Sequence, residues 1–416
     1  MGEILFLAHR IPFPPDRGDK IRSHNLFKAL ARLAPVHLGC FADDAADHAC
    51  EQEMAALAAS HILLDRGKSL PIAGLQALAK RQPLSLTAFH DRRMAGWVNK
   101  VLRSRPIETI FVFSGQMAQY VPEDFRGRLI VDLVDVDSAK FEAYGARGSG
   151  FRGWMERREG RLLRAEEARI AWRADRTLLV SKAEAALFAA RLDEAMPGRS
   201  TCRVEAVGNG IDSVLFDPAQ TLPEPRLAVK EGAGGPRIVF TGQMDYAPNI
   251  AAVERAITRI LPRIRARLPR ASLHVVGRNP PPSLLSRHGR DGVHIWGRVE
   301  DIRPWLAAAD MALVPLEIAR GVQNKVLEAM AMELPVVVSP GAATGIEAEH
   351  GRHFFVAESD EALANAVVLL AEDPQSARAM GLAAREWILA HASWQAALAS
   401  LPRMIGLQTE NLIDAA

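Results

Sequence analysis

Short apolar runs alternate with segments of helical spacing along the whole chain, and this alternation is its strongest pattern. Nine runs have the length and residue types of buried strands. They cover residues 4–8, 36–41, 109–113, 129–133, 177–180, 237–240, 272–276, 311–316 and 336–339. Strands separated by helical segments predict an α/β fold with parallel sheets.

The pattern is interrupted once by a long segment rich in proline and glycine, residues 217–236. Such composition is typical of a linker between domains. We therefore predict a first domain over 1–216 and a second over 237–385. Residues 386–416 contain Trp387 and Trp394 in helical runs, which predicts a packed helix and not a free tail. Ligands of parallel sheets bind beyond the carboxyl ends of the strands, so we expect chemistry where the two domains face each other.

Composition narrows the class of protein. The 416 residues suffice for two cores, and 49% hydrophobic with 24% charged residues is typical of a soluble globular protein. A net charge of +2 gives no general reason to expect nucleic-acid binding. Three cysteines without C-x-x-C spacing argue against a zinc site or a disulfide framework. No apolar run approaches the roughly 20 residues that span a bilayer, so we expect a cytoplasmic protein.

The most informative stretch predicts a strand at 311–316, a turn at Arg320 and Gly321, and a helix at 322–332. Free backbone N–H groups and the positive end of the helix dipole gather at such a helix start. Glycine lets a ligand approach the backbone closely, and arginine adds a full positive charge. The stretch therefore predicts an anion site that would fit a diphosphate.

Two charged residues lie on the predicted helix itself. Lys325 adds a second cation near its start, and Glu328 follows three residues later on the same face. A carboxylate there can accept hydrogen bonds from ribose hydroxyls just beyond the phosphates. An ordinary surface pair of Lys325 and Glu328 explains the spacing equally well.

A second part of the anion site is predicted after strand 237–240. Gly242 stands between that strand and the next helix, and Gln243, Met244 and Asp245 after it supply no cation. Arg278, directly after strand 272–276, is a further candidate for the charge that a diphosphate needs.

The first strand leads into another candidate site. His9 closes the strand, Gly18 permits close approach of a ligand, and Asp19 is a good N-cap for a helix that starts near Lys20. Lys20 and Arg22 then fall in the first helical turn, where cations are unfavourable unless an anion lies nearby. The alternative is a solvated helix start whose long basic side chains reach water. Neither a G-x-G-x-x-G fingerprint nor a P-loop is present.

Three aspartates, Asp132, Asp135 and Asp137, follow the predicted strand 129–133. The D-x-D spacing of the last two allows a divalent cation, because hard cations prefer oxygen ligands. We favour two other interpretations over a metal site: these aspartates cap a helix, or one of them is a carboxylate of the acceptor site.

Two runs are rich in arginine. Residues 152–176 hold eight arginines with interspersed aromatic and aliphatic residues, which fits either contact with an anionic membrane or a solvated helix. Residues 255–270 hold six arginines, and Pro262 is expected to bend or end that helix. Neither run has the aromatic platform of a single-strand nucleic-acid binder.

The stretch around Lys325 and Glu328 resembles the donor-binding segment of the retaining family 4 glycosyltransferases, which carries Glu-x7-Glu. Arg320 stands where the first of those glutamates is expected. The segments HRIPFPPDRGDKIRSHNL, VFSGQMAQYV and VDLVDVDS narrow the resemblance to the sugar transferases associated with exosortase/PEP-CTERM systems, and it covers nearly the whole chain.

The resemblance implies the GT-B architecture, with two facing Rossmann-like domains and a last helix that returns to the first. It implies transfer of a sugar, with retention, from a nucleoside-diphosphate sugar to a glycan or lipid-linked acceptor in exopolysaccharide biosynthesis, without a metal or cofactor. The predicted donor-binding residues are Gly18, Gly242, Arg278, Arg320, Gly321, Lys325 and Glu328.

His9 and Asp135 are expected near the reacting sugar, and peripheral contact with the inner membrane is part of the prediction. Two alternatives stay open: a nucleotide-sugar 2-epimerase of the same architecture, and a non-catalytic assembly protein docked on a membrane.

Overall fold

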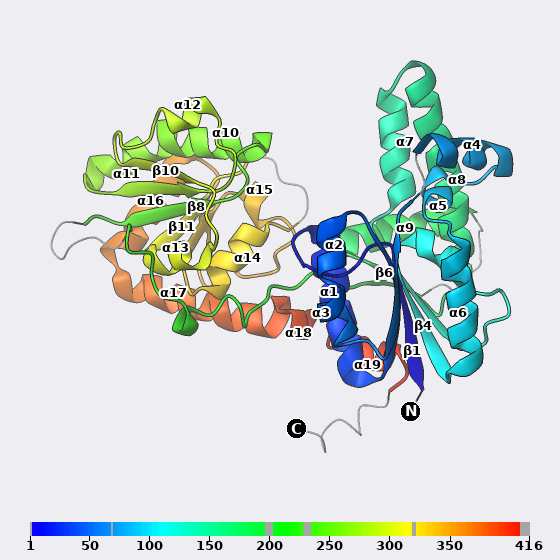
Figure 1. Ribbon diagram of the computed structural model, residues 1–416. Coiled ribbons are helices and arrows are strands. Elements are labelled where there is room, and N and C mark those ends of the chain that lie inside the picture. The colour runs from blue at the N-terminus through cyan, green and yellow to red at the C-terminus, as the bar shows by residue number, and fades with distance from the viewer. Residues whose placement is uncertain (1, 68–69, 196–202, 228–233, 318–321, 408–416) are drawn as a thin grey trace. The chain divides into compact units, whose positions relative to one another are not determined.

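The computed structural model describes residues 2–67, 70–195, 203–227, 234–317 and 322–407. The chain divides into two compact units (Figure 1). Unit 1 comprises Met1–Asn209 with Leu398–Ala416, and unit 2 comprises Gly210–Ala397.

Unit 1 is built on a parallel sheet in the order β3-β2-β1-β4-β5-β6-β7. Its strands are β1 (Glu3–Ala8), β2 (Val36–Ala42), β3 (Ser60–Asp65), β4 (Ile107–Phe113), β5 (Arg128–Val134), β6 (Arg176–Leu179) and β7 (Val204–Ala206). Its helices are α1 (Gly18–Leu33), α2 (Ala45–Ala49), α3 (Glu51–Ala55), α4 (Leu70–Lys80), α5 (Leu84–Ala88), α6 (Arg92–Ser104), η1 (Gly115–Tyr120), α7 (Asp137–Arg147), α8 (Gly150–Arg173), α9 (Lys182–Ala195) and α19 (Leu401–Met404).

The central strand β1 shows why unit 1 has helices on both faces of its sheet. Successive side chains of a strand point to opposite faces, and all six residues of β1 are buried. Leu5 and Leu7 belong to the core that α6, α8 and α9 cover. Phe6 stacks on Phe27 of α1 on the other face. A continuous apolar run is therefore the expected sequence of this strand, and Figure 1 shows α1 on one side of the sheet and α6 on the other.

Unit 2 contains a second parallel sheet, in the order β10-β9-β8-β11-β12-β13. Its strands are β8 (Arg237–Thr241), β9 (Ser272–Val276), β10 (Val293–Gly297), β11 (Met311–Val314), β12 (Val336–Val338) and β13 (Phe355–Val356). Its helices are η2 (Pro218–Gln220), α10 (Ala247–Arg255), η3 (Ala256–Ile260), α11 (Leu261–Arg267), α12 (Pro282–Leu285), α13 (Arg303–Ala308), α14 (Asn324–Ala331), α15 (Pro340–Ala343), α16 (Asp360–Glu372), α17 (Pro374–Trp387), η4 (Ile388–Ala392) and α18 (Trp394–Ala397).

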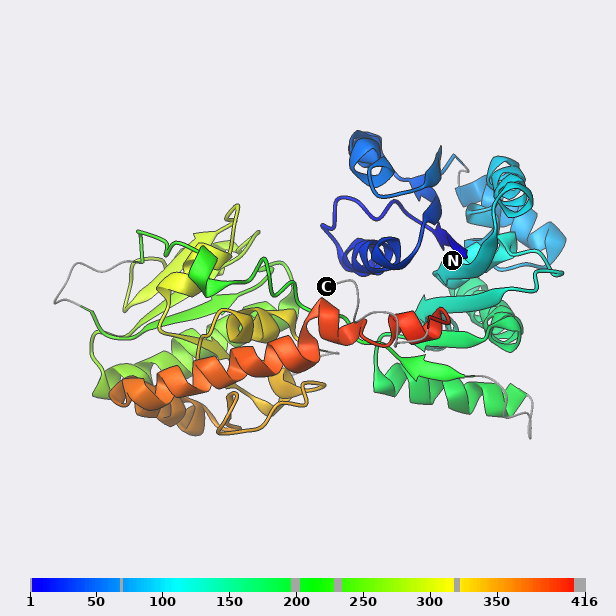
Figure 2. The same ribbon diagram turned by 90° about the horizontal axis from the view of Figure 1, so that it is seen from below.

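Both sheets have the doubly wound order in which the first strand lies inside and the chain then runs outward in two directions. In unit 2, Figure 1 shows α10, α11 and α12 above the sheet and α13, α14 and α17 below it. Figure 2, seen from below, again shows helices on both faces of each sheet. The α/β prediction with parallel sheets is confirmed.

The nine predicted strands all occur, and the described residues contain four more, β3, β7, β10 and β13. Sequence analysis missed β3 and β7 because their side chains are mostly half-buried, as expected of strands near a sheet edge, so they lack continuous apolar runs. Pro262 does not end its helix. The chain continues from α10 through a π-helical segment, η3, into α11, whose first turn contains Pro262.

The division between the units differs from the predicted boundary. It falls between Asn209 and Gly210, upstream of the linker expected at 217–236. Arg385 of α17 donates to the Phe216 carbonyl at 2.8 Å and to Asp217 at 3.1 Å, and Leu227 is buried in the core of unit 2. These contacts attach the proline-rich segment to unit 2, although its composition is that of a linker.

The C-terminal segment joins unit 1 later in the chain than the predicted position 386. Helices α17, η4 and α18 belong to unit 2, and only residues from Leu398 onward belong to unit 1. There α19 packs beside α1, and an Arg128 guanidinium N–H donates to the carbonyl of Ile405.

Candidate functional site

Glycines stand at the carboxyl ends of three adjacent strands of unit 2, β8, β9 and β10. Gly242 follows β8 at a φ of 151°, a conformation that favours glycine. A Cβ added to Gly277, after β9, would lie 1.6 Å from the carbonyl oxygen of Gly242. The Gly277 N–H donates to the Gly297 carbonyl, at the end of β10, at 2.9 Å. Glycine is needed here because these backbone segments approach one another closely.

Lys325, in the first turn of α14, reaches this edge from the next strand-to-helix connection. Its Nζ donates to Oδ1 of Asn249 at 2.5 Å and lies 5.0 Å from the ring centroid of Phe240. A Cβ on Gly242 would lie 3.3 Å from that Nζ. The glycine predicted after β8 and the lysine predicted on α14 are thus brought together by the fold.

Asn249 fixes the position of the lysine. Its side chain is buried at the start of α10, and its Nδ2 donates to the Gln243 carbonyl at 2.8 Å, which leaves Oδ1 facing Lys325. The role of Asn249 is not predictable from the sequence, because no local pattern pairs it with a lysine 76 positions away.

The charges at this edge are incompletely balanced. Burial lowers the pKa of Lys325 to about 8, although the nearby Glu328 carboxylate acts to raise it. Burial likewise raises the pKa of Glu328 to about 7, with Lys325 acting in the opposite direction. Desolvation therefore outweighs the mutual attraction of the pair. An anion arriving at Nζ would stabilise the charged form of the lysine.

Of the other predicted donor residues in unit 2, the structure describes Arg278 and Glu328. Arg320 and Gly321 lie outside the described residues. The Arg278 side chain is exposed, and its backbone carbonyl accepts from the Met244 N–H at 2.8 Å. The pKa of Asp245 is lowered by a hydrogen bond from Asn279 and, to a smaller extent, by the charge of Arg278.

In unit 1, His9 is enclosed at the end of β1. Its ring stacks on Phe113 and meets Phe89 edge-on, each at 5.8 Å between centroids. Its Nε2 lies 3.3 Å from Oδ2 of Asp19 and 3.2 Å from Nη1 of Arg10. Burial lowers the pKa of His9, which favours a neutral ring. Nδ1 is buried without a described hydrogen-bond partner. The expected role of His9 near the reacting sugar stays a prediction.

Asp19 is not the N-cap that we predicted. Helix α1 begins at Gly18, with Arg17 before it, so Asp19 lies within the first turn. Its carboxylate accepts from Arg10 at 2.6 Å. Burial acts to raise the pKa of Asp19, but hydrogen bonds from His9 and Arg10 outweigh it and hold that pKa below its usual range. A Cβ added to Gly18 would meet no described atom within 4 Å, so packing does not require glycine there.

The two cations near the start of α1 are neither solvated nor free for a ligand. Lys20 is buried, and its ammonium group pairs with Asp47. Arg22 is also buried and donates to Asp132 at 2.8 Å and to Asn209 at 3.0 Å. The sequence pattern predicts an anion near these cations, and the structure supplies it as the carboxylates of Asp47 and Asp132.

Asp135 and Asp137 share a partner on the surface. The ammonium group of Lys140 lies 2.7 Å from Asp135 and 3.3 Å from Asp137. Asp132, the first of the three aspartates, is engaged by Arg22 in the interior. Within the described ranges, no group of three or more His, Cys, Asp or Glu side chains is arranged to hold a metal ion. Neither Asp135 nor Asp137 serves as a side-chain cap of α7.

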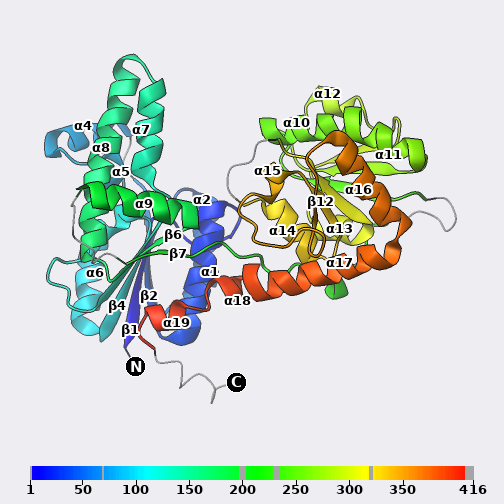
Figure 3. The same ribbon diagram turned by 180° about the vertical axis from the view of Figure 1, so that it is seen from behind.

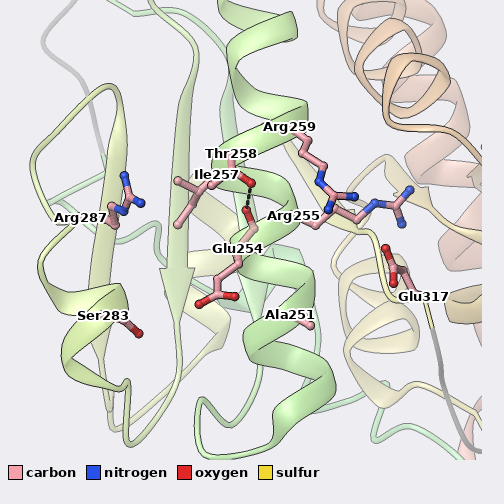
Figure 4. Close-up of a pocket in the computed structure, with 9 residues that line it drawn as sticks. All are labelled: Ala251, Glu254, Arg255, Ile257, Thr258, Arg259, Ser283, Arg287 and Glu317. Carbon is pink, nitrogen blue, oxygen red and sulfur yellow. Dashed lines mark hydrogen bonds between the residues drawn. The ribbon is translucent and has the colours of Figure 1, made fainter.

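A cavity of about 460 Å³ lies elsewhere on unit 2, between α10, η3, α12 and the segment after β11 (Figure 4). Arg255 and Arg259 lie on the side of Glu317, whereas Arg287 lies on the other side of the helix. Arg255 is already held by Asp360 at 2.5 Å. The described lining residues include neither Gly242 nor Lys325, so this cavity is separate from the candidate site.

Part of unit 2 matches a known protein family. Residues 235–373 match the family described as "Glycosyl transferases group 1". The matched range contains Gly242, Arg278, Lys325 and Glu328. It supports the glycosyltransferase part of the resemblance, whereas the exosortase/PEP-CTERM branch stays a prediction.

Two curated relatives are mannosyltransferases. The GDP-mannose-dependent monoacylated alpha-(1-6)-phosphatidylinositol monomannoside mannosyltransferase of Corynebacterium glutamicum is 29% identical over 211 residues, which cover 46% of this chain and 53% of the relative. The GDP-mannose-dependent alpha-(1-6)-phosphatidylinositol monomannoside mannosyltransferase of Mycolicibacterium smegmatis is 28% identical over 223 residues, covering 50% and 57%. The chain thus spans little more than half the length of these relatives.

Solved structures agree in fold. Sucrose-phosphate synthase from Thermosynechococcus elongatus superposes with a TM-score of 0.60 at 18% identity and covers 100% of both chains. Anabaena HepE in complex with UDP superposes at 0.62 with 16% identity, covering 97% of this chain and 99% of HepE. WaaG, a glycosyltransferase of lipopolysaccharide biosynthesis, gives 0.56 at 17% identity, covering 97% of this chain and 100% of WaaG. The chain therefore has the GT-B fold, and the range that matches the family lies in its second unit.

Proposed function

We propose that this protein transfers a sugar from a nucleoside-diphosphate sugar to a glycan or lipid-linked acceptor. One observation carries the proposal: Lys325 is fixed by Asn249 beside Gly242, at the carboxyl edge of a sheet within the matched domain. This is the edge at which doubly wound sheets bind nucleotides.

The chemistry follows from the charge that develops on the departing diphosphate. A positioned ammonium group and the free N–H groups of a helix start stabilise that charge without reorganisation during the reaction. Lys325 supplies the first and the N-terminus of α14 the second. Glu328, one turn further along α14, is proposed to accept hydrogen bonds from the ribose. The proposal needs neither a metal ion nor a cofactor and includes retention at the sugar, as the family resemblance implies.

The donor is proposed to be a GDP- or UDP-hexose. The two mannosyltransferase relatives are named as GDP-mannose-dependent, and HepE has been solved with UDP and with UDP-glucose. Unit 2 contributes the diphosphate contacts, which are common to both donor classes.

The acceptor is proposed to be lipid-linked, because both relatives are named for transfer to a phosphatidylinositol mannoside. Exopolysaccharide assembly at the cytoplasmic face of the inner membrane is the process that we propose on the PEP-CTERM resemblance. No helix within the described ranges is long and apolar enough to cross a bilayer.

Thermal unfolding with a panel of UDP-, GDP-, ADP-, dTDP- and CMP-sugars tests the proposal, with and without magnesium. A donor at 100 times its Kd stabilises the protein by about 2.7 kcal/mol, so the melting temperature should rise by several degrees. Lys325→Ala should reduce the rise, whereas Lys100→Ala, an exposed lysine of α6, should not.

No rise with any donor contradicts the proposal and favours a non-catalytic assembly protein. Conversion of the donor to its epimer without an acceptor favours a 2-epimerase instead.

A further inference from the structure

The hairpin of α7 and α8 exposes aromatic side chains at its tip. Phe151 and Trp154, in the first turns of α8, are 72% and 46% exposed, and their rings stack at 5.8 Å between centroids. Tyr144, near the end of α7, is 55% exposed. Clustered apolar side chains open to solvent mark interaction sites on soluble proteins.

Helix α4 adds an aliphatic row beside this tip. Ile72, Leu75 and Leu78 recur every third residue and are all exposed, Leu75 by 72%. A guanidinium N–H of Arg158 in α8 donates to the Ala77 carbonyl of α4 at 2.8 Å. Figures 1 and 3 both show α4 alongside α7 and α8.

Trp154 lies one turn before Arg158 on the same face of α8, so the aromatic cluster is about one helical turn from α4. We name this combined region the hairpin-tip surface. It comprises Ile72, Leu75, Leu78, Tyr144, Phe151 and Trp154.

The charges around this surface are almost all positive. The described side chains of residues 72–82 and 143–158 include five cations and one carboxylate, Glu156, which pairs with Arg152 at 2.9 Å. The remaining length of α8 differs, because Arg164, Arg169 and Arg173 pair with glutamates there. The arginine-rich run therefore does not act as one amphipathic face, and its unbalanced part coincides with the exposed apolar side chains.

The hairpin is closely packed and presents its tip on a fixed scaffold. A Cβ added to Gly153 would lie 2.3 Å from the Gly148 carbonyl oxygen. One added to Gly145 would lie 2.8 Å from the Arg157 nitrogen. Helices that approach this closely lose little conformational freedom when their tip binds a partner.

We propose that the hairpin-tip surface docks on an anionic phospholipid bilayer. Aromatic and aliphatic side chains enter the interface, and the surrounding cations meet lipid phosphates. Tyr and Trp suit that depth because one end of each ring system is apolar and the other is polar. The inference rests on the proposed function, for which it supplies the surface that holds the enzyme at a lipid-linked acceptor.

Co-sedimentation with vesicles tests the docking surface. Vesicles of equal parts phosphatidylcholine and phosphatidylglycerol should bind the full chain, with binding that weakens as salt increases, and phosphatidylcholine alone should bind far less. The triple variant Leu75→Ser, Phe151→Ser, Trp154→Ser should bind the mixed vesicles at least about 100-fold more weakly. The matched triple variant Leu285→Ser, Leu369→Ser, Leu389→Ser changes exposed leucines of unit 2 and should bind like the unmodified protein.

Charge reversal gives an independent test that removes no apolar side chain. Lys80→Glu with Arg81→Glu should weaken binding by at least about fivefold per residue changed. Equal binding by the apolar triple variant and the unmodified protein would overturn the proposal. So would equal binding to both vesicle types, or sedimentation velocity that shows self-association lost in the triple variant, because a second copy would then cover this surface.

The donor melting panel separates this inference from the proposed function. Failure to bind vesicles with donor stabilisation intact overturns only the docking surface. Vesicle binding without stabilisation by any donor overturns the transferase and leaves a membrane-docked protein.

Discussion

Helices α1 and α14 each follow a connection from a parallel strand and carry cations near their starts, yet these cations have different partners. In α1, Lys20 and Arg22 are buried against Asp47 and Asp132. In α14, Lys325 donates to an amide oxygen and lies over an aromatic ring, with Glu328 acting on it only through space. The cations of α1 pair with carboxylates of the fold itself, whereas the described residues place no carboxylate in ion-pair contact with Lys325, which would therefore gain stability from an incoming anion.

The contrast shows that a cation at a helix start does not by itself identify a ligand site. Asp132, the partner of Arg22, lies 110 positions away in the sequence. The presence or absence of such a partner decides between a structural and a binding role. Variants of the two helices should therefore fail in different ways.

The largest effect is expected from breaking the buried pair of α1. Arg22→Ala leaves Asp132 unpaired in the interior, where burial already raises the pKa of its carboxyl, and should lower the free energy of unfolding by about 3–5 kcal/mol. Denaturant unfolding measures this loss. Arg22→Leu with Asp132→Leu should recover most of it, because replacing both members of a buried pair is far less costly. A loss below about 1 kcal/mol for the single variant would contradict a structural role.

Lys325→Ala should have the converse result, an intact fold with impaired chemistry. Removing one preorganised donor to a developing negative charge typically costs about 10²–10³-fold in rate. Sugar transfer from labelled donor measures the effect, and Lys100→Ala is the control. A transfer rate within threefold of that of the unmodified protein would contradict a role for Lys325 in donor binding.

Gly242→Ala should weaken transfer by about tenfold, because a Cβ there would lie 2.9 Å from Nδ2 of Asn249 and strain the backbone at a positive φ. Steady-state kinetics should show the change. Gly96→Ala, in a helix where the added Cβ meets no described atom within 4 Å, controls for substitution alone. Equal rates for both variants would mean that the loop does not approach the donor.

The smallest effect on stability is expected at Asp135. Its pair with Lys140 is partly exposed, so Asp135→Asn should change the free energy of unfolding by less than about 1 kcal/mol. The same variant also tests the predicted role near the reacting sugar. A fall in transfer rate beyond tenfold at unchanged stability supports that role, and an unchanged rate removes it.

The sequence predicts the fold well because both sheets are parallel and buried on both faces, which makes their inner strands continuous apolar runs. The edge strands β3 and β7 were not predicted, because their side chains are mostly half-buried and so do not form continuous apolar runs. Composition misplaced the domain division, because a proline-rich segment can be held by a distant residue such as Arg385.

Residues of the candidate site could be predicted only where a sequence motif falls on a connection between a strand and a helix. Gly242 and Lys325 follow from strand-to-helix connections, and the fold brings them together. Asn249 could not be anticipated, and the Asp47 and Asp132 partners of Lys20 and Arg22 were equally hidden. Each depends on a contact between residues far apart in the chain, which local spacing does not encode.

The most direct test of Lys325 as the diphosphate ligand is calorimetry of GDP and UDP binding at pH 8 in buffers of different ionisation enthalpy. Burial lowers the pKa of Lys325 to about 8, so the unliganded lysine is partly deprotonated there, and a bound diphosphate should raise that pKa. We predict proton uptake on binding and an affinity that falls about tenfold between pH 7 and 9, both lost in Lys325→Ala. Tight binding without proton uptake, unchanged in the variant, would contradict the account.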